Sequence, residues 1–202
     1  MKPTKVSSPR PPAPGRRHGS RRKPAASLQR AANSPHKRTA RLHEPREESS
    51  VRVPALLLAC GNSLRQDDGV GLRIADAVEQ LLPASHLRVV AGQQFTPEMA
   101  ADVAAAELAI FVDASAADEP GAIRVAAVAA RGDTPETHRL DAPALLAMAE
   151  TLCGHAPAQA FTVTVGAAHF DYGEELSGEL RQAVPRAVRL VENLVRAFTA
   201  GA

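Results

Sequence analysis

From about residue 51 onward, short apolar runs alternate with stretches in which apolar residues recur at helical spacing. A short, uninterrupted apolar run is typical of a strand buried in a sheet, because both faces of such a strand are covered. Runs of this kind predict five strands, at residues 55–60, 87–91, 108–112, 123–128 and 161–165.

Helical patterns fill the intervals between these runs. Apolar residues from Val70 to Leu81 lie four, four and three positions apart, which predicts a helix that ends at Pro83. Cap residues indicate the starts of the other helices, because their side chains accept hydrogen bonds from first-turn N–H groups. The helices are predicted after Thr96 to about Ala106, after Asp141 to about Leu152, and after Ser177 to about Phe198.

The connection between the third and fourth strands sets the direction of the fourth. Only residues 114–122 separate these strands, fewer than the dozen or so that a parallel crossover requires. The fourth strand is therefore expected to run antiparallel to the third. The pattern as a whole predicts an α/β fold with a mixed five-stranded sheet between layers of helices.

Charge divides the chain into two parts. Residues 1–50 hold 13 of the 24 Lys and Arg but three of the 22 Asp and Glu, so this part is +10 and the rest is −8. The same segment contains eight of the 16 prolines and no long apolar run. Since it cannot bury enough surface to offset the entropy of ordering, we expect a disordered basic leader over 1–50 and one folded domain over 51–202.

The leader and the cysteines bear on location and partners. Arg16-Arg17 is not followed by an apolar stretch, which argues against an export signal. The leader is interpreted as an unstructured extension or the product of an upstream start codon. A nucleic-acid-binding tail is the alternative, disfavoured by the lack of aromatic residues for base stacking. No apolar run could cross a membrane, and Cys60 and Cys153 form no CxxC pair, so a cytoplasmic protein without a disulfide is expected.

The loop after the first strand, residues 61–71, carries two adjacent carboxylates. They would repel a phosphate, and the loop has neither GxGxxG nor Gly-Lys-Ser, which excludes the common nucleotide-binding loops. One carboxylate can be explained by the favourable interaction of an acid with a helix N-terminus, and Asp67 suits this position. Asp68 is then left as the functional candidate, although local chemistry leaves capping and function equally open.

Two further residues fall at or beside loops that can converge with Asp68 on one edge of the sheet. Asp113 ends the third strand, and His138 lies in the loop before the Asp141 helix. Each has a simpler interpretation by itself, Asp113 as a turn residue and His138 as a solvated loop side chain. Together with Asp68, they form a set of two carboxylates and an imidazole suited to a divalent metal such as nickel or zinc.

Nucleophilic catalysis has weaker support. Ser63 and Ser115 lie near the expected site, but neither belongs to GxSxG. Cys60 is interpreted as a small buried hydrophobic residue. His169 is expected in a structural turn between strand and helix, with a second site loop at 170–174 as the alternative.

The loop Gly-Asn-Ser-Leu-Arg-Gln-Asp-Asp-Gly-Val-Gly resembles the opening signature of the [NiFe]-hydrogenase maturation proteases. Three further segments agree in order with this family, at residues 111–114, 136–138 and 170–177. The resemblance extends from about Ala55 to Phe198 and does not cover the leader. The first motif is specific, and the others support it by their order and spacing.

The resemblance implies a three-layer α/β/α sandwich with strand order 2-1-3-5-4 and strand 4 antiparallel. It also implies an endopeptidase, in a family often grouped with aspartic peptidases, that removes a C-terminal extension from the hydrogenase large-subunit precursor after nickel insertion. Nickel is supplied by the substrate, with zinc or cadmium as possible substitutes. The family's metal-contacting and catalytic residues correspond to Asp68, Asp113 and His138. Some relatives have Glu in place of Asp68, and many have an acid where Arg139 stands.

A monomer that acts on the precursor, without membrane or nucleic-acid partners, is therefore expected. The alternative from another class is a non-hydrolytic nickel-sensing chaperone that docks on the precursor. Both would use the same carboxylates and imidazole, so cleavage of the precursor distinguishes them.

Overall fold

The computed structural model describes residues 53–131 and 140–201. The leader expected over 1–50 and the candidate ligand His138 lie outside these ranges. The described strands are β1 (Val53–Cys60), β2 (Leu87–Gly92), β3 (Ala106–Ser115), β4 (Ile123–Ala127) and β5 (Gln159–Gly166). The described α-helices are α1 (Val70–Leu81), α2 (Ala100–Ala104), α3 (Ala142–Cys153) and α4 (Gly178–Gly201), and two 3₁₀ turns, η1 (Gln66–Gly69) and η2 (Pro97–Met99), precede α1 and α2.

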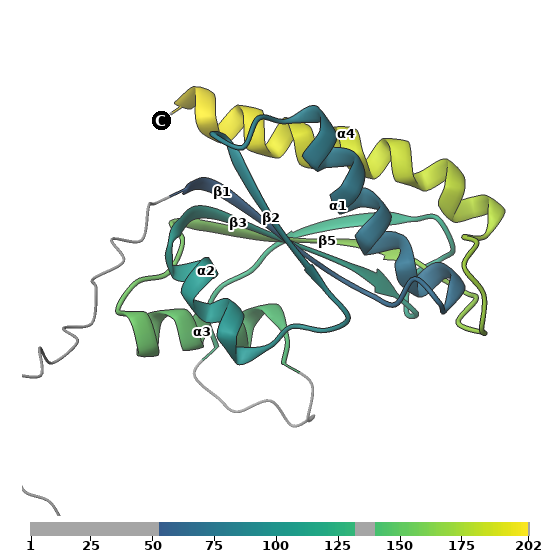
Figure 1. The fold of residues 1–202 in the computed structure, drawn as a ribbon, viewed down its shortest axis with the longest axis horizontal. Helices are drawn as coiled ribbons and strands as arrows, with labels where there is room; N and C mark the ends of the chain where they lie inside the picture. The colour runs from purple at the N-terminus through teal and green to yellow at the C-terminus, as the bar shows by residue number, and fades with distance from the viewer. Residues whose placement is uncertain (1–52, 132–139, 202) are drawn as a thin grey trace, which may run out of the picture. The chain divides into compact units, whose positions relative to one another are not determined.

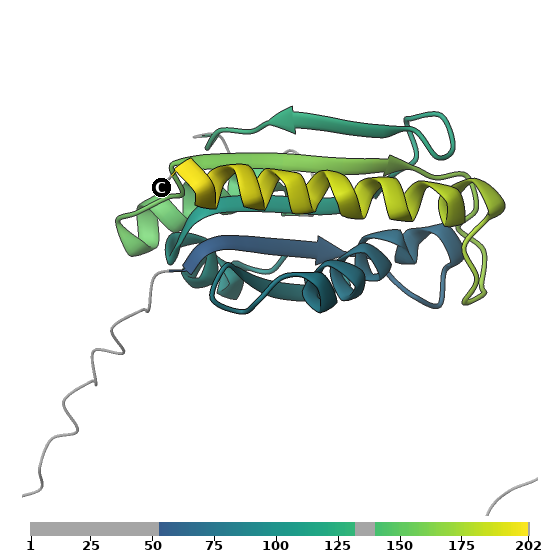
Figure 2. The same cartoon turned by 90° about the horizontal axis from the view of Figure 1, so that it is seen from above.

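The strands form one mixed sheet in the order β2-β1-β3-β5-β4. All neighbouring pairs are parallel except β4 and β5, and Figure 2 shows β4 at one edge of the sheet pointing against the other strands. The predicted strand order and the antiparallel direction of strand 4 are confirmed. The short 114–122 connection explains the direction, because it returns the chain without a crossover helix.

Helices cover both faces of the sheet, with α1 and α4 on one side and α2 and α3 on the other (Figure 1). Side chains of β1 alternate between the two apolar cores, as the two-residue period of a strand requires. Ala55 and Leu57 belong to the α1/α4 core, whereas Leu56 and Leu58 belong to the α2/α3 core, and all four are fully buried. The uninterrupted apolar run that predicted this strand is thus explained by two covered faces.

The helix expected from Thr96 to Ala106 is shorter than predicted. It begins as the 3₁₀ turn η2, Thr96 gives no side-chain cap hydrogen bond, and α2 ends at Ala104. Ala106 instead pairs with Val53 of β1, and the Val53 N–H donates to the Ala105 carbonyl (3.0 Å). Pairing with the sheet overrides the helix-forming tendency of the alanines at this boundary.

The caps expected for α3 and α4 are present. Asp141 Oδ1 accepts a hydrogen bond from the Ala144 N–H (2.9 Å), and Ser177 Oγ accepts one from the Leu180 N–H (3.4 Å). Both bonds satisfy first-turn N–H groups that have no partner within the helix. Among the helices of the described residues, none is long and apolar enough to cross a membrane.

Candidate active site at the carboxyl edge of the sheet

Two glycines bring the start of α1 against the carboxyl ends of β1 and β3. Gly61 has φ +145°, and a Cβ at this position would lie 1.9 Å from the Asp68 carbonyl oxygen. A Cβ at Gly71 would lie 2.4 Å from the carbonyl oxygen of Cys60 and 3.0 Å from that of Val112. Any side chain here would force the backbones apart, so these glycines set the position of the intervening carboxylates.

Asp68 lies on η1, above the end of β1. Its Oδ2 accepts a hydrogen bond from the Asn62 N–H (3.0 Å), and its side chain is partly buried. Asn62 is two residues beyond Cys60, the last residue of β1. The hydrogen bond therefore fixes the carboxylate to the strand end while part of it is open to solvent.

Asp113 lies near the carboxyl end of β3, the strand beside β1. It is opposite Thr164 of β5, and its Oδ1 accepts a hydrogen bond from the following Ala114 N–H (2.8 Å). In the register of β1 and β3, Ala59 is opposite Val112, so Asp113 follows at the level where β1 ends. Asp113 thus lies near the end of β3, and Asp68 is hydrogen-bonded to the residues that follow the end of β1, the neighbouring parallel strand.

A cavity of about 290 Å³ opens beside Asp113. Its walls are mostly apolar and include Phe95 and Phe111, whose rings meet edge to face at 5.4 Å and 82°. Cys60, at the end of β1, and Asp141, at the start of α3, also line it. An apolar cavity with a carboxylate at its wall can accept an uncharged side chain next to a polar reacting group.

A second cavity, of about 590 Å³, lies on the other side of the β1 end. It is bounded by residues 61–64, by Arg73 and Asp76 of α1, and by Glu174 from the segment before α4. The carboxyl edge of the sheet therefore has a mostly apolar hollow on one side and a hollow of mixed polarity on the other.

Asp67, adjacent to Asp68, is fully buried and serves a different purpose from the capping role expected of it. Neither η1 nor α1 receives a side-chain cap hydrogen bond. Asp67 Oδ1 accepts from the Ser177 N–H (2.7 Å), and Oδ2 accepts from the N–H groups of His169 (3.1 Å) and Ala168 (3.3 Å). Asp67 lies in the first turn of η1, as expected, but its carboxylate forms no helix cap because it binds N–H groups of another segment.

The same contacts govern the ionisation of Asp67. Burial by itself would raise the pKa of this carboxyl, but hydrogen bonds from Ser177, His169 and Ala168 outweigh it and hold the pKa below its ordinary value. Asp67 is thus a structural anion that joins the 61–71 loop to the segment between β5 and α4. No signal in the sequence points to this pairing, because the partners lie more than 100 residues away.

Three further candidate residues, Cys60, His169 and His138, have different outcomes. Cys60 is 3% exposed at the end of β1, in agreement with a small buried residue. His169 has an exposed side chain, and its backbone carbonyl accepts from the Asp67 N–H (3.1 Å), so its backbone joins the connection between β5 and α4 to the 61–71 loop. His138 lies outside the described residues, and within residues 53–131 and 140–201 no three His, Cys, Asp or Glu side chains are grouped to hold a metal ion. The site that includes His138 stays a prediction.

Sequence comparison alone gives no relatives: no protein-family model and no curated protein matches the chain. Solved structures do match. The hydrogenase-maturating endopeptidase HybD of E. coli superimposes with a TM-score of 0.57 at 22% identity, over 72% of this chain and 93% of its own. The fold is that of the hydrogenase maturation peptidases.

Two archaeal structures agree with this assignment. The maturation protease HycI of Thermococcus kodakarensis has a TM-score of 0.55 at 22% identity, over 73% of this chain and 93% of its own. The hydrogenase 2 maturation peptidase of a Thaumarchaeota archaeon has a TM-score of 0.54 at 23% identity, over 70% of this chain and 97% of its own. The resemblance noted in the sequence is therefore confirmed at the level of the maturation-peptidase fold.

Proposed function

We propose that the protein is an endopeptidase that removes the C-terminal extension of a [NiFe]-hydrogenase large-subunit precursor after nickel insertion. The observation that carries the proposal is the placement of Asp68 and Asp113 at the ends of β1 and β3, on the fold of the maturation peptidases. In open α/β sheets, ligands bind outside the carboxyl ends of the strands, which is where these two carboxylates lie.

In this proposal the nickel belongs to the substrate, and the chain's own residues recognise it. Asp68 and Asp113 supply oxygen ligands and His138 supplies a nitrogen ligand, a donor set that suits nickel and also zinc or cadmium. Two carboxylates additionally offset the positive charge of a divalent ion. Binding through the metal would hold the precursor's chain end, with its scissile bond, at the carboxyl edge of the sheet. The protein would meet this precursor in the cytoplasm.

The hydrogen bond to Asn62 gives Asp68 a defined direction before the substrate binds. A ligand whose orientation is fixed loses less conformational entropy when it engages a metal than a mobile side chain does. The backbone contact of Asp113 with Ala114 has the same effect on the second carboxylate. Recognition of nickel by pre-oriented ligands would make cleavage depend on prior metal insertion.

The decisive experiment incubates the purified protein with nickel-loaded and nickel-free precursor and follows the mass of the large subunit. We expect a decrease equal to the mass of the extension, in the nickel-loaded sample only. A stable complex without any mass change would support the non-hydrolytic chaperone instead. Cleavage that is equal with and without nickel would contradict the metal-recognition part of the proposal.

A further inference from the structure

The segment between β5 and α4 has no regular secondary structure, yet its backbone is held at many points. Asp67 binds the N–H groups of Ala168, His169 and Ser177, as described above. Gly173 forms an isolated parallel bridge with the 61–71 loop: its N–H donates to the Leu64 carbonyl (2.9 Å), and its carbonyl accepts from the Gln66 N–H (2.7 Å). These bonds connect the segment directly to the loop that carries Asp68.

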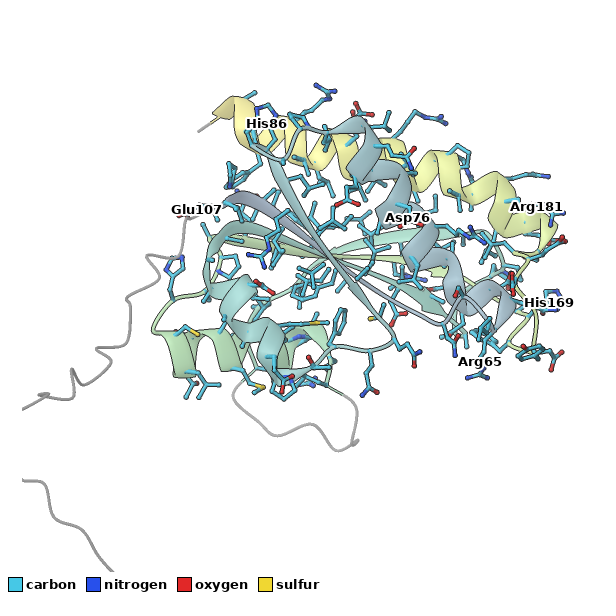
Figure 3. All side chains as sticks on the ribbon, in the orientation of Figure 1. Arg65, Asp76, His86, Glu107, His169 and Arg181 are labelled. Atoms are coloured by element: carbon cyan, nitrogen blue, oxygen red, sulfur yellow. The ribbon has the colours of Figure 1, made fainter. Side chains whose placement is uncertain are left out.

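Three arginines from different parts of the fold hold the carbonyl groups of the same segment. Arg65 Nε donates to the Phe170 carbonyl (3.2 Å), and Arg73 of α1 donates to the Glu174 carbonyl (3.5 Å). Arg181 of α4 donates to the Leu176 carbonyl. Figure 3 shows Arg65, His169 and Arg181 at one end of the molecule, away from His86 and Glu107. Hydrogen bonds to charged groups are stronger than those between neutral groups, so the backbone is ordered before any partner binds.

Phe170 and Leu176 of this segment pack against the α1/α4 core, whereas several other side chains are exposed. Tyr172 is 86% exposed, the largest exposed fraction among the large hydrophobic side chains of the described residues. Leu64, across the bridge, is 44% exposed. Asp171, Glu174 and Glu175 are exposed as well, and within the described ranges none of their carboxylates is in an ion pair.

An ordered backbone that presents an exposed tyrosine is the arrangement found at protein interfaces. Tyrosine supplies a large contact area with only two side-chain torsions to restrict, and it is enriched among the residues that dominate binding energy. Here the cost of ordering the loop is met during folding, so binding would lose little further entropy. The three exposed carboxylates form an acidic rim, with the three arginines that hold the backbone beside it, and would pair with cations of a partner.

We propose that residues 170–177, the docking loop, bind a folded protein surface that has an apolar pocket for Tyr172 and lysines or arginines around it. The inference rests on the proposed function in taking this surface to be the body of the large-subunit precursor, outside its C-terminal extension. The choice of the precursor as partner is supported by the direct connection between the docking loop and the candidate active site. The Gly173 bridge fixes the docking loop to the Asp68 loop, so a precursor held at Tyr172 has its chain end near the carboxylates.

The test measures the dissociation constant for two probes, a [NiFe]-hydrogenase large-subunit precursor and the same subunit truncated at its mature C-terminus. Tyr172→Ala is expected to weaken binding of both probes by about 30-fold, the effect of losing an interface residue worth about 2 kcal/mol. Tyr172→Phe keeps the ring and should stay within about threefold of wild type. Leu152→Ala, which removes a 67% exposed leucine of α3, is the matched control and should leave binding unchanged.

Neutralising the rim by Asp171→Asn, Glu174→Gln and Glu175→Gln together should weaken binding and reduce its dependence on salt, because the attraction of the partner's cations is lost. Thermal unfolding of the Tyr172→Ala variant should match wild type, since the side chain is not packed in the core. Unchanged affinity of Tyr172→Ala for both probes would overturn the proposal.

The outcomes separate this inference from the proposed function. Tyr172-dependent binding of both probes without any cleavage would leave the docking loop correct and the peptidase assignment wrong. Cleavage of nickel-loaded precursor with the same KM for wild type and Tyr172→Ala would support the peptidase and refute the docking loop. Failure of wild type to bind either probe would refute the choice of partner.

Discussion

The two sides of the carboxyl edge are built by different interactions. The loop side, residues 61–71 and 167–177, is held by backbone N–H groups that donate to the Asp67 carboxylate and by three arginines that donate to backbone carbonyls. The pocket side, around the 290 Å³ cavity, is held by apolar packing such as the contact of Phe95 with Phe111. Asp68 belongs to the loop side, and Asp113 lines the cavity on the pocket side. The comparison indicates that surface loops without a core of their own can be ordered by charged side chains.

The same comparison assigns different roles to two neighbouring carboxylates, Asp67 and Asp68, that look equivalent in the sequence. Asp67 is fully buried and accepts three backbone hydrogen bonds, whereas Asp68 is partly buried with one such bond described, from Asn62. A buried anion with several backbone donors is committed to structure. A partly exposed carboxylate at a strand end is available for a ligand. Substitutions should therefore affect stability at one position and activity at the other.

The largest expected effect is on processing, from Asp68→Asn or Asp113→Asn. Each removes a negative charge and keeps the shape, so precursor cleavage should fall by about 100-fold or more while unfolding changes by less than about 1 kcal/mol. Cleavage rates and thermal melts of the same samples provide the measurement. Either variant cleaving at the wild-type rate would remove that residue from the site.

The His138→Ala variant is expected to lose precursor processing, as Asp68→Asn does. Loss of one donor should reduce affinity for nickel or cadmium by an order of magnitude or more, and affinity should also fall below about pH 6.5 as the imidazole is protonated. His169→Ala is the control, because the structural role of His169 is carried by its backbone. Loss of processing in the His169 variant alone would move the site to the 170–174 segment.

The sequence predicts those features that depend on local pattern and chain length. The five strands, the antiparallel direction of the fourth, and the caps at Asp141 and Ser177 all agree with the structure, since apolar runs, loop lengths and cap residues act over a few positions, whereas the strand order came from the family resemblance. Where distant segments compete, the sequence misleads. Ala106 belongs to β3 because it pairs with Val53 of β1. The Asp67 carboxylate forms no cap on its own helix because it accepts hydrogen bonds from N–H groups of residues 168–177.

Asp67→Asn tests the loop side alone. The amide would place an N–H₂ against backbone N–H donors, and the loss of charged hydrogen bonds should cost about 3 kcal/mol of folding free energy. For a domain of this size, that corresponds to a decrease in Tm of about 6–12 °C. A similar Tm for variant and wild type would contradict the structural role of Asp67. Binding of the precursor should also weaken, as the docking loop loses its support.

Acidification should weaken the loop side before the pocket side. The pKa of Asp67 is lowered in the folded protein from an ordinary value of 3.8, so its contribution to stability is present above that value and is lost as pH falls further through the folded pKa. Between about pH 5 and pH 3, wild type should therefore lose more Tm than Asp67→Asn. The matched control is Phe111→Leu, a pocket-side change whose effect should be the same at both pH values. Parallel pH curves for wild type and Asp67→Asn would show that Asp67 is not the titrating anchor.

The smallest expected effect is that of deleting residues 1–48. This segment has a charge excess and many prolines but no apolar run from which a core could form, so neither side of the carboxyl edge should depend on it. We expect the truncated protein to keep the Tm of the full chain within about 2 °C and to cleave nickel-loaded precursor at the same rate. The measurement compares the two proteins at low and at physiological salt, because a weak electrostatic contact of the basic leader would appear only at low salt. A large loss of thermal stability at physiological salt would show that the leader contributes to the folded domain.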